Sequence, residues 1–544
     1  MMLRTLGLVA GLLATAVCRN VVTTDAVSLM DIQGRGERSP LEGEVVTTRG
    51  IVTAIRADER GFWLQDVGGD GDLETSDAVL VWGRAGVAVG DDVRLRGNVV
   101  EFVGREGDRP LTELADIESL DVLSSGNDLP PALTLTPLPT ESVADAIEYW
   151  SRLESMRVRF EDARVVAPTN RFGETVVVME SNGPVGRHVF VRPLADGRVD
   201  YNPERILLDD GIRDAIEGRA GDEVRDLVGI VDYGFGNYRV QPAAWEHREG
   251  DRVVLGVRQR GGVAVVSFNV ENLLELEEEA LDEKIDSLSA FIIGPLLLPE
   301  ILVLQEVESE SVLGGLTERV NREQGTSYVA KALGSSDGRG IENAFLYDSK
   351  RVSLLESFLL SGPLVEEAFG AASPSPGREP LVGRFEHGGV EFWIVGNHLK
   401  SKSGDDPLFG ARQPPVRATE VVRKAQARAV RAYVTALLGD EQNALVLVAG
   451  DFNDFAFGEP GEGPDHPLAI LEGLGESPRL TNLISTLDEP YTFIYQGNAQ
   501  VLDHMLLSEE ALVRVEGFEI VHGNADDPDG ASDHDPLVVR LSTR

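Results

Sequence analysis

Polar residues able to bind a metal ion or move a proton recur where apolar runs end in the second half of the sequence. In order along the chain they are Asn269, Glu306, His398, Asp451, Asn453, Asp503, His504, Asp533, His534 and Asp535. Taken singly, each is more often a turn former, a helix cap or a structural histidine. Six successive strand ends that each carry an acid, an amide or an imidazole instead indicate one shared site.

These residue types suit the hydrolysis of a phosphate ester. Carboxylate and amide oxygens without thiols are the ligands of a hard divalent cation. Histidines can transfer protons or bind a phosphate near neutral pH, and neighbouring carboxylates can select a tautomer and stabilise the imidazolium. A metal ion, a base and phosphate-binding donors together make up the machinery of metal-assisted hydrolysis.

The elements that position these residues read as an α/β domain over residues 263–544. Apolar, strand-like runs such as VAVVSFNV, ILVLQEV, FWIVGNHL, ALVLVAGDF and PLVVRL alternate with segments of helical spacing. The helical segments are 277–293, 312–324 and 416–438.

Six motifs in this half resemble, in the same order, those of the endonuclease/exonuclease/phosphatase superfamily: SFNVEN, LQEVE, NHLKS, GDFND, LDHMLLS and SDHDPLVV. The resemblance implies a four-layer α/β sandwich, with two mixed sheets packed face to face and helices outside. The superfamily includes deoxyribonucleases, abasic-site endonucleases, sphingomyelinases and inositol polyphosphate phosphatases. Glu342 in IENAFLYD and Arg378 in GREPLVGRF favour the deoxyribonuclease branch.

The resemblance also implies roles for the cation and the attacking water. Glu306 is expected to be the main metal ligand, with Asn269 beside it and Asp533 near the same ion or a second one. The expected ion is Mg²⁺, with Mn²⁺ or Ca²⁺ as alternatives. His534 is expected to be the general base, oriented by Asp503.

Further residues are expected to act on the phosphate. Asp451 and Asn453 would position the water or the scissile phosphate, and His398, paired with Glu342, would hold the phosphate.

Three residues are expected to contact substrate: Arg378, Lys400 and His504. Lys402 is a further candidate, with a solvated lysine as the alternative. His504 stands where the family often has tyrosine, so a packed or exposed histidine remains its alternative.

The first half of the chain is rich in short β-like runs separated by Gly/Asp turns. We expect an oligonucleotide-binding-like (OB-like) barrel over residues 40–128, a Pro/Thr-rich linker at 129–142, and a second OB-like segment over 141–250. GDDVR at 90–94 and GDEVR at 221–225 form a weak internal echo. Five aromatic residues could stack on bases or belong to the core: Phe62, Trp63, Tyr233, Phe235 and Tyr238.

Charge and cysteine content narrow the function classes. The chain has 50 Lys+Arg and 91 Asp+Glu, a net charge of −41, which weighs against a general nucleic-acid coat protein. The charge does not exclude an enzyme that approaches phosphate through a cation. The one cysteine, Cys18, excludes a disulfide framework and a cysteine-rich zinc site.

Residues 1–17 predict export. Arg4 precedes an apolar run from Leu6 to Val17 that is too short to span a membrane, and Ala14-Thr15-Ala16 offers a cleavage site. A lipid anchor on Cys18 is the alternative. The sequence therefore predicts a secreted, divalent-metal-dependent nuclease acting on DNA, with RNA as a further substrate. The alternatives are a sphingomyelinase-like phosphodiesterase or phosphatase, and a catalytically idle binding protein on the same fold.

Overall fold

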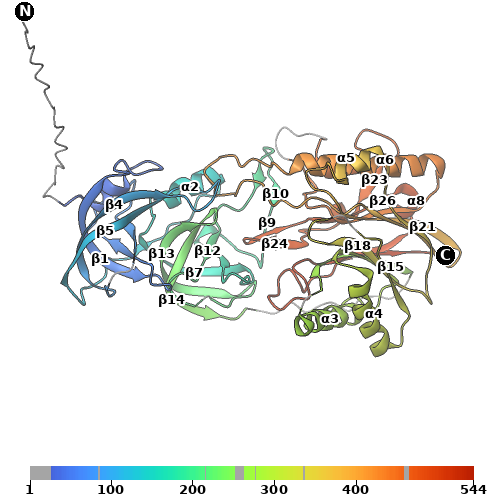
Figure 1. The fold of residues 1–544 in the computed structure, drawn as a ribbon, viewed down its shortest axis with the longest axis horizontal. Coiled ribbons are helices and arrows are strands. Elements are labelled where there is room, and N and C mark those ends of the chain that lie inside the picture. Colours follow the sequence, from blue (N-terminus) through green and yellow to red (C-terminus); the bar gives the residue numbers. More distant parts are fainter. Residues whose placement is uncertain are drawn as a thin grey trace, which may run out of the picture.

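The computed structural model describes residues 26–83, 86–214, 216–250, 262–275, 277–334, 337–458 and 465–543. The predicted signal peptide (1–17) and Cys18 lie outside these residues. Two β domains and one α/β domain follow one another along the long axis of the molecule (Figure 1). Among the described helices, none has the length and apolar character needed to cross a membrane.

The N-terminal barrel is a closed five-stranded sheet with the order β1-β2-β3-β5-β4. Its strands are β1 (Val45–Ile55), β2 (Gly61–Gln65), β3 (Ala78–Trp82), β4 (Asp92–Phe102) and β5 (Leu111–Ser124), and the short helix α1 (Leu29–Gln33) packs on β1 and β3. The predicted small barrel is thus confirmed, whereas nucleic-acid binding by it stays a prediction.

The second barrel repeats this strand order. Its strands are β7 (Arg157–Ala167), β8 (Thr175–Met179), β12 (Ile206–Leu208), β13 (Glu223–Gly234) and β14 (Asn237–Arg248), and β13 also pairs with β7. In each barrel the third strand pairs in parallel with the fifth. The echoed GDDVR and GDEVR segments lead into β4 and β13, which are the equivalent fourth strands.

The α/β domain has the predicted four layers. One six-stranded sheet has the order β17-β18-β16-β15-β28-β27, and the other has the order β19-β20-β21-β22-β26-β23. An apolar cluster fills the space between the sheets, and two further clusters lie under the helices. Helices α3 and α4 cover one outer face, and α5 and α6 cover the other (Figure 1).

The remaining elements have the following bounds. The first sheet contains β15 (Val263–Leu273), β16 (Ile301–Val307), β17 (Tyr328–Lys331), β18 (Glu342–Asp348), β27 (Val515–Ile520) and β28 (Leu537–Leu541). The second contains β19 (Ser353–Leu359), β20 (Leu381–His387), β21 (Val390–His398), β22 (Val446–Asp451), β23 (Leu480–Asn482) and β26 (Asp503–Ser508). The shorter strands are β6 (Leu133–Thr134), β9 (Val189–Phe190), β10 (Arg192–Pro193), β11 (Val199–Asp200), β24 (Phe493–Tyr495) and β25 (Asn498–Gln500).

The three predicted helices are confirmed as α3 (Glu278–Ile293), α4 (Glu310–Gln324) and α6 (Glu420–Asp440). Local sequence sets the ends of α4, because the Ser309 side chain accepts from Val312 N–H and Gly325 ends the helix in a left-handed conformation. The other helices are α2 (Val143–Ser151), α5 (Pro363–Phe369), α7 (Pro467–Glu472) and α8 (Glu509–Leu512), and η1 (Glu180–Asn182) and η2 (Leu483–Thr486) are 3-10 turns.

The second barrel is joined to the α/β domain by shared structure. Strand β9 pairs in parallel with β25, which extends the β24–β25 hairpin. Asn202 Nδ2 donates to Asn498 Oδ1 at 2.7 Å, and the Arg205 guanidinium binds the carbonyl of Gln496. The segment 493–500 is therefore positioned by both domains.

Four of the five aromatic residues that were candidates for base stacking belong to cores. Phe62, Trp63, Tyr233 and Tyr238 are buried, whereas Phe235 is 69% exposed. An apolar cluster runs from the N-terminal barrel through the second barrel to Phe409 of the α/β domain, which explains the burial of Trp63, Tyr233 and Tyr238.

Buried carboxyl groups accompany this cluster. Burial raises the pKa of Glu154 to about 8, although its carboxylate accepts a 3.1 Å hydrogen bond from Thr112 N–H. Burial likewise raises the pKa of Glu113 to about 7, with a further contribution from the charge of Asp232. Both groups are thus held in their neutral form at mildly acidic pH.

The Glu154 carboxyl makes stability depend on pH. It keeps its proton up to about pH 8 in the folded chain, against 4.5 for an unperturbed Glu. Between these values unfolding releases a proton, so the free energy of unfolding should fall by up to about 1.4 kcal/mol per pH unit as pH rises. In urea titrations at several pH values, Glu154→Gln should show a shallower decline than the wild type. The exposed Glu118→Gln variant is the control, and parallel profiles for Glu154→Gln and wild type would contradict the assignment.

Candidate active site

Strand register brings three of the predicted residues side by side. His398, the last residue of β21, is the register partner of Asp451 at the end of β22. Asp451 is in turn the register partner of Asp503 at the start of β26. Because directly paired residues project from the same face of a sheet, their side chains form one row. Gly450 allows the close approach of β21, since a Cβ there would lie 1.9 Å from the Asn397 carbonyl oxygen.

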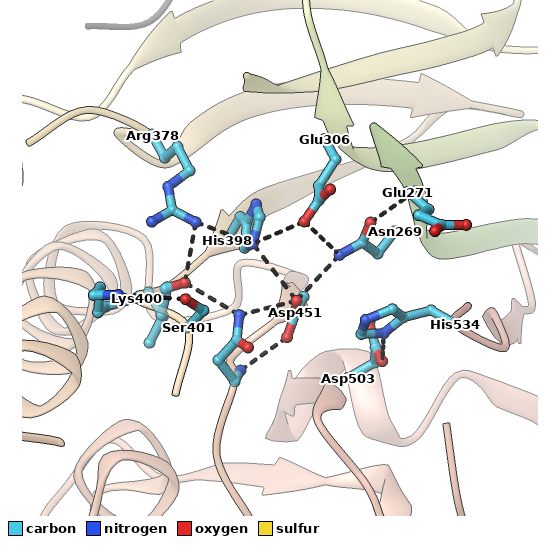
Figure 2. Close-up of polar contacts among 12 residues, drawn as sticks. Asn269, Glu271, Glu306, Arg378, His398, Lys400, Ser401, Asp451, Asp503 and His534 are labelled. Carbon is cyan, nitrogen blue, oxygen red and sulfur yellow. Dashed lines mark hydrogen bonds and ion pairs between the residues drawn. The ribbon is translucent and has the colours of Figure 1, made fainter. Parts of the chain in front are cut away.

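Asn269 and Glu306 approach this row from the other sheet (Figure 2). The Asn269 side-chain amide donates to Asp451 Oδ2 at 3.1 Å and lies 3.4 Å from Glu306 Oε1. Glu306 has a positive φ of 63° next to a register shift between β15 and β16, and its second oxygen accepts from Asn272 N–H. Such left-handed backbone is strained for a non-glycine residue and is frequent at functional sites.

His534 and Asp503 form a buried pair on the side of Asp451 that faces away from His398 (Figure 2). His534 Nδ1 donates to Asp503 Oδ2 at 2.7 Å. Burial by itself lowers the pKa of His534, but the charge and hydrogen bond of Asp503, together with Asp533 and Asp451, hold it well above its ordinary value. The pairing leaves Nε2 as the nitrogen that can face a ligand.

Asp451 lies at the centre of the cluster. Burial, together with the negative charges of Asp503 and Glu306, raises its pKa to about 7 against the opposing charge of His534. Asn453, another left-handed residue, donates to Asp451 through both its backbone and side-chain nitrogens, at 2.8 and 3.0 Å. Asp451 can therefore gain or lose a proton near neutral pH.

His398 is paired with Arg378. Arg378 Nη1 donates to His398 Nε2 at 3.1 Å, and its Nε forms a 3.1 Å ion pair with Asp337. Burial and the positive charges of Arg378 and Arg339 hold the pKa of His398 well below its ordinary value. His398 is thus a neutral imidazole that accepts at Nε2 and carries its proton on Nδ1.

The predicted pairing of His398 with Glu342 is wrong. The Glu342 carboxylate accepts from the backbone N–H groups of Leu333 and Gly334, which hold it against that loop. Glu342 Oε2 and His398 Nδ1 are both buried without a hydrogen-bond partner. His398 instead lies 3.7 Å from Glu306 and 3.6 Å from Asp451.

His504 does not contact the site. Neighbouring residues of a strand point to opposite faces, so His504 turns away from the face that carries Asp503. Its ring lies within hydrogen-bond distance of the Asn482 side chain (3.0 Å) and the Asp454 carbonyl (2.9 Å), and burial lowers its pKa to about 4. His504 is therefore a packed, buried histidine, which is the alternative to substrate contact that the sequence allowed.

The two lysines of the HLKSKSG segment make contacts within the protein, and phosphate binding by Lys400 stays a prediction. Lys400 Nζ donates to Ser403 O at 3.0 Å, within its own loop. Lys402 Nζ lies 3.4 Å from Asp454 and 4.2 Å from the centre of the Phe455 ring. The 2.7 Å contact of Arg423 to the same carboxylate shows that Lys402 belongs to a buried ion-pair network.

The oxygen atoms at the site fit a hard cation that takes only a few of its ligands from the protein. Within the described ranges, no three His, Cys, Asp or Glu residues converge as a complete metal-binding group. Mg²⁺ needs only one or two carboxylates and otherwise keeps water or substrate oxygens. Glu306, with Asn269 beside it, meets this requirement. Asp533 is half-exposed and lies 4.0 Å from His534 Nε2, where it joins no such group.

Two residues at the site were missed in the sequence. Glu271 follows Asn269 closely, and its pKa is raised by burial and by the charge of Asp533. Phe493 stands 4.7 Å from the His534 ring, between ring centres, and its backbone forms a β-bridge with His534. The aromatic run YTFIY ahead of LDH was the available signal for Phe493.

Two parts of the chain match models of known protein families. Residues 268–527 match the model of the Endonuclease/Exonuclease/phosphatase family. The C-terminal domain belongs to this family. Enzymes of the family hydrolyse phosphate esters and typically use a divalent metal ion. Residues 125–249, which include the second barrel, match a domain of unknown function (DUF8508).

Several solved structures resemble the hydrolase domain. A humanized D. rerio TDP2 is 17% identical over 52% of this chain and 99% of its own, with a TM-score of 0.36. The catalytic domain of human Nocturnin is 19% identical over 53% and 96%, also with a TM-score of 0.36. A Bacteroides thetaiotaomicron mannosyl-6-phosphatase is 17% identical over 51% and 99%, with the same TM-score. No curated protein matches the sequence.

The buried position of His504 predicts a structural effect of its removal. His504→Ala should lower the free energy of unfolding by about 1–3 kcal/mol, because it leaves the Asn482 amide and the Asp454 carbonyl without partners. Urea unfolding measures the loss, and turnover per folded molecule should stay close to that of the wild type. A large loss of turnover with unchanged stability would contradict this structural role and show that His504 acts in the reaction.

Proposed function

We propose that this protein is a divalent-cation-dependent nuclease that hydrolyses phosphodiester bonds of extracellular DNA, with RNA as a further substrate. The observation that carries the proposal is the buried Asp503–His534 pair beside Asp451, Asn269 and Glu306. A carboxylate-oriented imidazole next to a hard-cation ligand is the arrangement required to direct water at a phosphate.

His534 is the proposed general base. Asp503 holds its Nδ1 proton, so Nε2 is the nitrogen that accepts a proton from water. The surrounding carboxylates favour the protonated ring of His534. Only the neutral ring can act as a base, so part of the negative charge of these carboxylates must be neutralised. A cation held by Glu306 and Asn269, proposed to be Mg²⁺ with Mn²⁺ or Ca²⁺ as alternatives, would supply that positive charge and polarise the phosphate.

Asp451 and Asn453 are proposed to orient the water or the scissile phosphate. The Asn453 nitrogens hold the Asp451 carboxylate in one orientation. With a pKa of about 7, Asp451 is also a second group able to exchange a proton during the reaction.

Arg378 and His398 are proposed to bind the phosphate. The buried guanidinium supplies the positive charge, and its hydrogen bond to Nε2 fixes the ring of His398. Because His398 is neutral and its Nε2 accepts from Arg378, it is proposed to orient the guanidinium rather than to supply the proton for the leaving oxygen. Asp533, half-exposed beside His534, is proposed to tune the charge of that imidazole instead of binding the first ion.

Export is part of the proposal. It rests on the apolar run of residues 1–17, with lipidation of Cys18 as the alternative. Mass spectrometry of protein recovered from the medium and from membranes distinguishes cleavage near residue 17 from a lipid-modified Cys18.

Metal dependence and substrate class can be tested together. Purified protein should nick supercoiled plasmid in the presence of Mg²⁺, lose this activity in EDTA and regain it when excess Mg²⁺ is added. Parallel reactions with RNA, sphingomyelin and a chromogenic phosphodiester identify the substrate class. Turnover of sphingomyelin alone would favour the lipid phosphodiesterase, and full activity in EDTA would contradict metal dependence.

The proposed base can be tested by substitution. His534→Ala should lower kcat on plasmid by at least about 100-fold, the usual contribution of a general base, without loss of the folded state. His387→Ala is a matched control, because His387 lies in β20 and contacts Thr543 instead of the site. Gel assays of initial nicking rates measure both. Wild-type rates for His534→Ala would exclude it as the base.

A further inference from the structure

Equivalent loops of the two barrels meet beside the hydrolase domain. The β4–β5 loop of the N-terminal barrel carries Arg105, and the equivalent β13–β14 turn of the second barrel carries Phe235 and Gly236. The Arg105 guanidinium lies 5.9 Å from the centre of the Phe235 ring. A Cβ on Gly236, whose φ is +76°, would lie 2.9 Å from Arg105 and 2.4 Å from Pro407, so all three domains approach here.

Phe235 is held in an exposed position. The Arg239 guanidinium lies 5.4 Å from the centre of the Phe235 ring, and its Nη1 forms a 2.5 Å ion pair with Asp209 Oδ2. Arg105 is half-exposed, with Asp108 3.1 Å away. An aromatic side chain that is fixed by buried structure but presents most of its surface to solvent is suited to stack on a base.

A second pair of rings leads from the hydrolase site toward this point. Phe493 lies 4.7 Å from the His534 ring, and Tyr495 is stacked 6.5 Å beyond Phe493 with an angle of 11° between the planes. Phe493 and Tyr495 are two residues apart on β24, so both rings lie on the same face of the strand. Tyr495 is 56% exposed.

Arg205 connects the two groups of rings. Its guanidinium lies 5.6 Å from the centre of the Phe409 ring. Phe409 is two residues from Pro407, which a Cβ on Gly236 would contact together with Arg105. Arg205 also binds the carbonyl of Gln496, which ties β24 to the second barrel.

We propose that Phe493, Tyr495, Arg105 and Phe235 form a track that binds an unpaired strand of nucleic acid and leads it to His534. The proposal deepens the proposed nuclease function and rests on it for the reaction. Bases of an unpaired strand can stack on exposed rings, whereas those of a duplex are already stacked on one another. Loops at these positions are oligonucleotide contacts in OB-type barrels, and here they come from both barrels.

Stacking also suits the charge of the chain. With a net charge of −41, a broad electrostatic grip on phosphates is unfavourable. Stacking on rings needs few cations, and Arg105 supplies one where the strand would pass. The substrate class expected from the track is single-stranded nucleic acid, or a duplex with frayed or unpaired ends.

The test uses Tyr495→Ala, Phe235→Ala and the double variant in the full chain. The first measurement is fluorescence anisotropy with a labelled 20-nucleotide oligo-dT in EDTA, and the second is kcat/KM with Mg²⁺ on this strand and on bis(p-nitrophenyl) phosphate. Trp82→Ala is the matched control. Trp82 is also an exposed aromatic residue (39%) with an arginine on its ring, since the Arg56 guanidinium lies 5.5 Å from the ring centre. It lies on β3 of the N-terminal barrel, outside the proposed track.

Each single variant should bind the strand about 10-fold more weakly, the usual effect of losing one base-stacking ring. The ratio of kcat/KM on the strand to kcat/KM on the small diester should fall by a similar factor, while Trp82→Ala matches the wild type. Equally tight binding of a 20-bp duplex would overturn the preference for an unpaired strand.

The outcomes separate the track from the nuclease function. Wild-type binding and rates in all track variants would overturn the track and leave the nuclease intact. A loss confined to Trp82→Ala would place the strand on the barrel's own face and also overturn the track. Weaker binding in the variants, with no turnover of any nucleic acid, would support the track and overturn the nuclease function.

Discussion

The pairing register of β21, β22 and β26 is the constraint on which the hydrolase site depends. It places His398, Asp451 and Asp503 side by side in one row of one sheet through direct strand pairing. A shift of one residue in any of these strands would turn its polar side chain to the opposite face. The apolar cluster between the two sheets, which penalises such a shift, therefore also maintains the geometry of the site.

The same arrangement forces several carboxyl groups into a small volume, and the two histidines respond in opposite ways. His534 lies among carboxylates and is stabilised as an imidazolium, whereas His398 lies beside Arg378 and stays neutral. Asp451, between them, has a pKa of about 7. Burial alone would disfavour charge on both imidazoles, so the sign of each neighbouring charge decides the difference.

The barrels are more than a spacer in front of the hydrolase domain. They share an apolar cluster that also includes Phe409 of the hydrolase domain, and β9 extends the hairpin that contains Phe493. Two barrels with the same strand order present equivalent loops at the same place. Their repeated topology thus has a geometric consequence, because it brings Arg105 and Phe235 together beside Pro407 of the hydrolase domain.

The sequence by itself determined the family motifs, the α/β pattern, the two β segments and most members of the site, because these depend on local residue type and on spacing within strands. Only the tertiary structure decided which partners the polar side chains take. It separated Glu342 from His398 through the backbone of Leu333 and Gly334, turned His504 into the core, and placed Phe493 against His534. Such contacts join segments far apart in the chain, and they depend on strand register and on the left-handed turn at Glu306, neither of which leaves a periodic signal in the sequence.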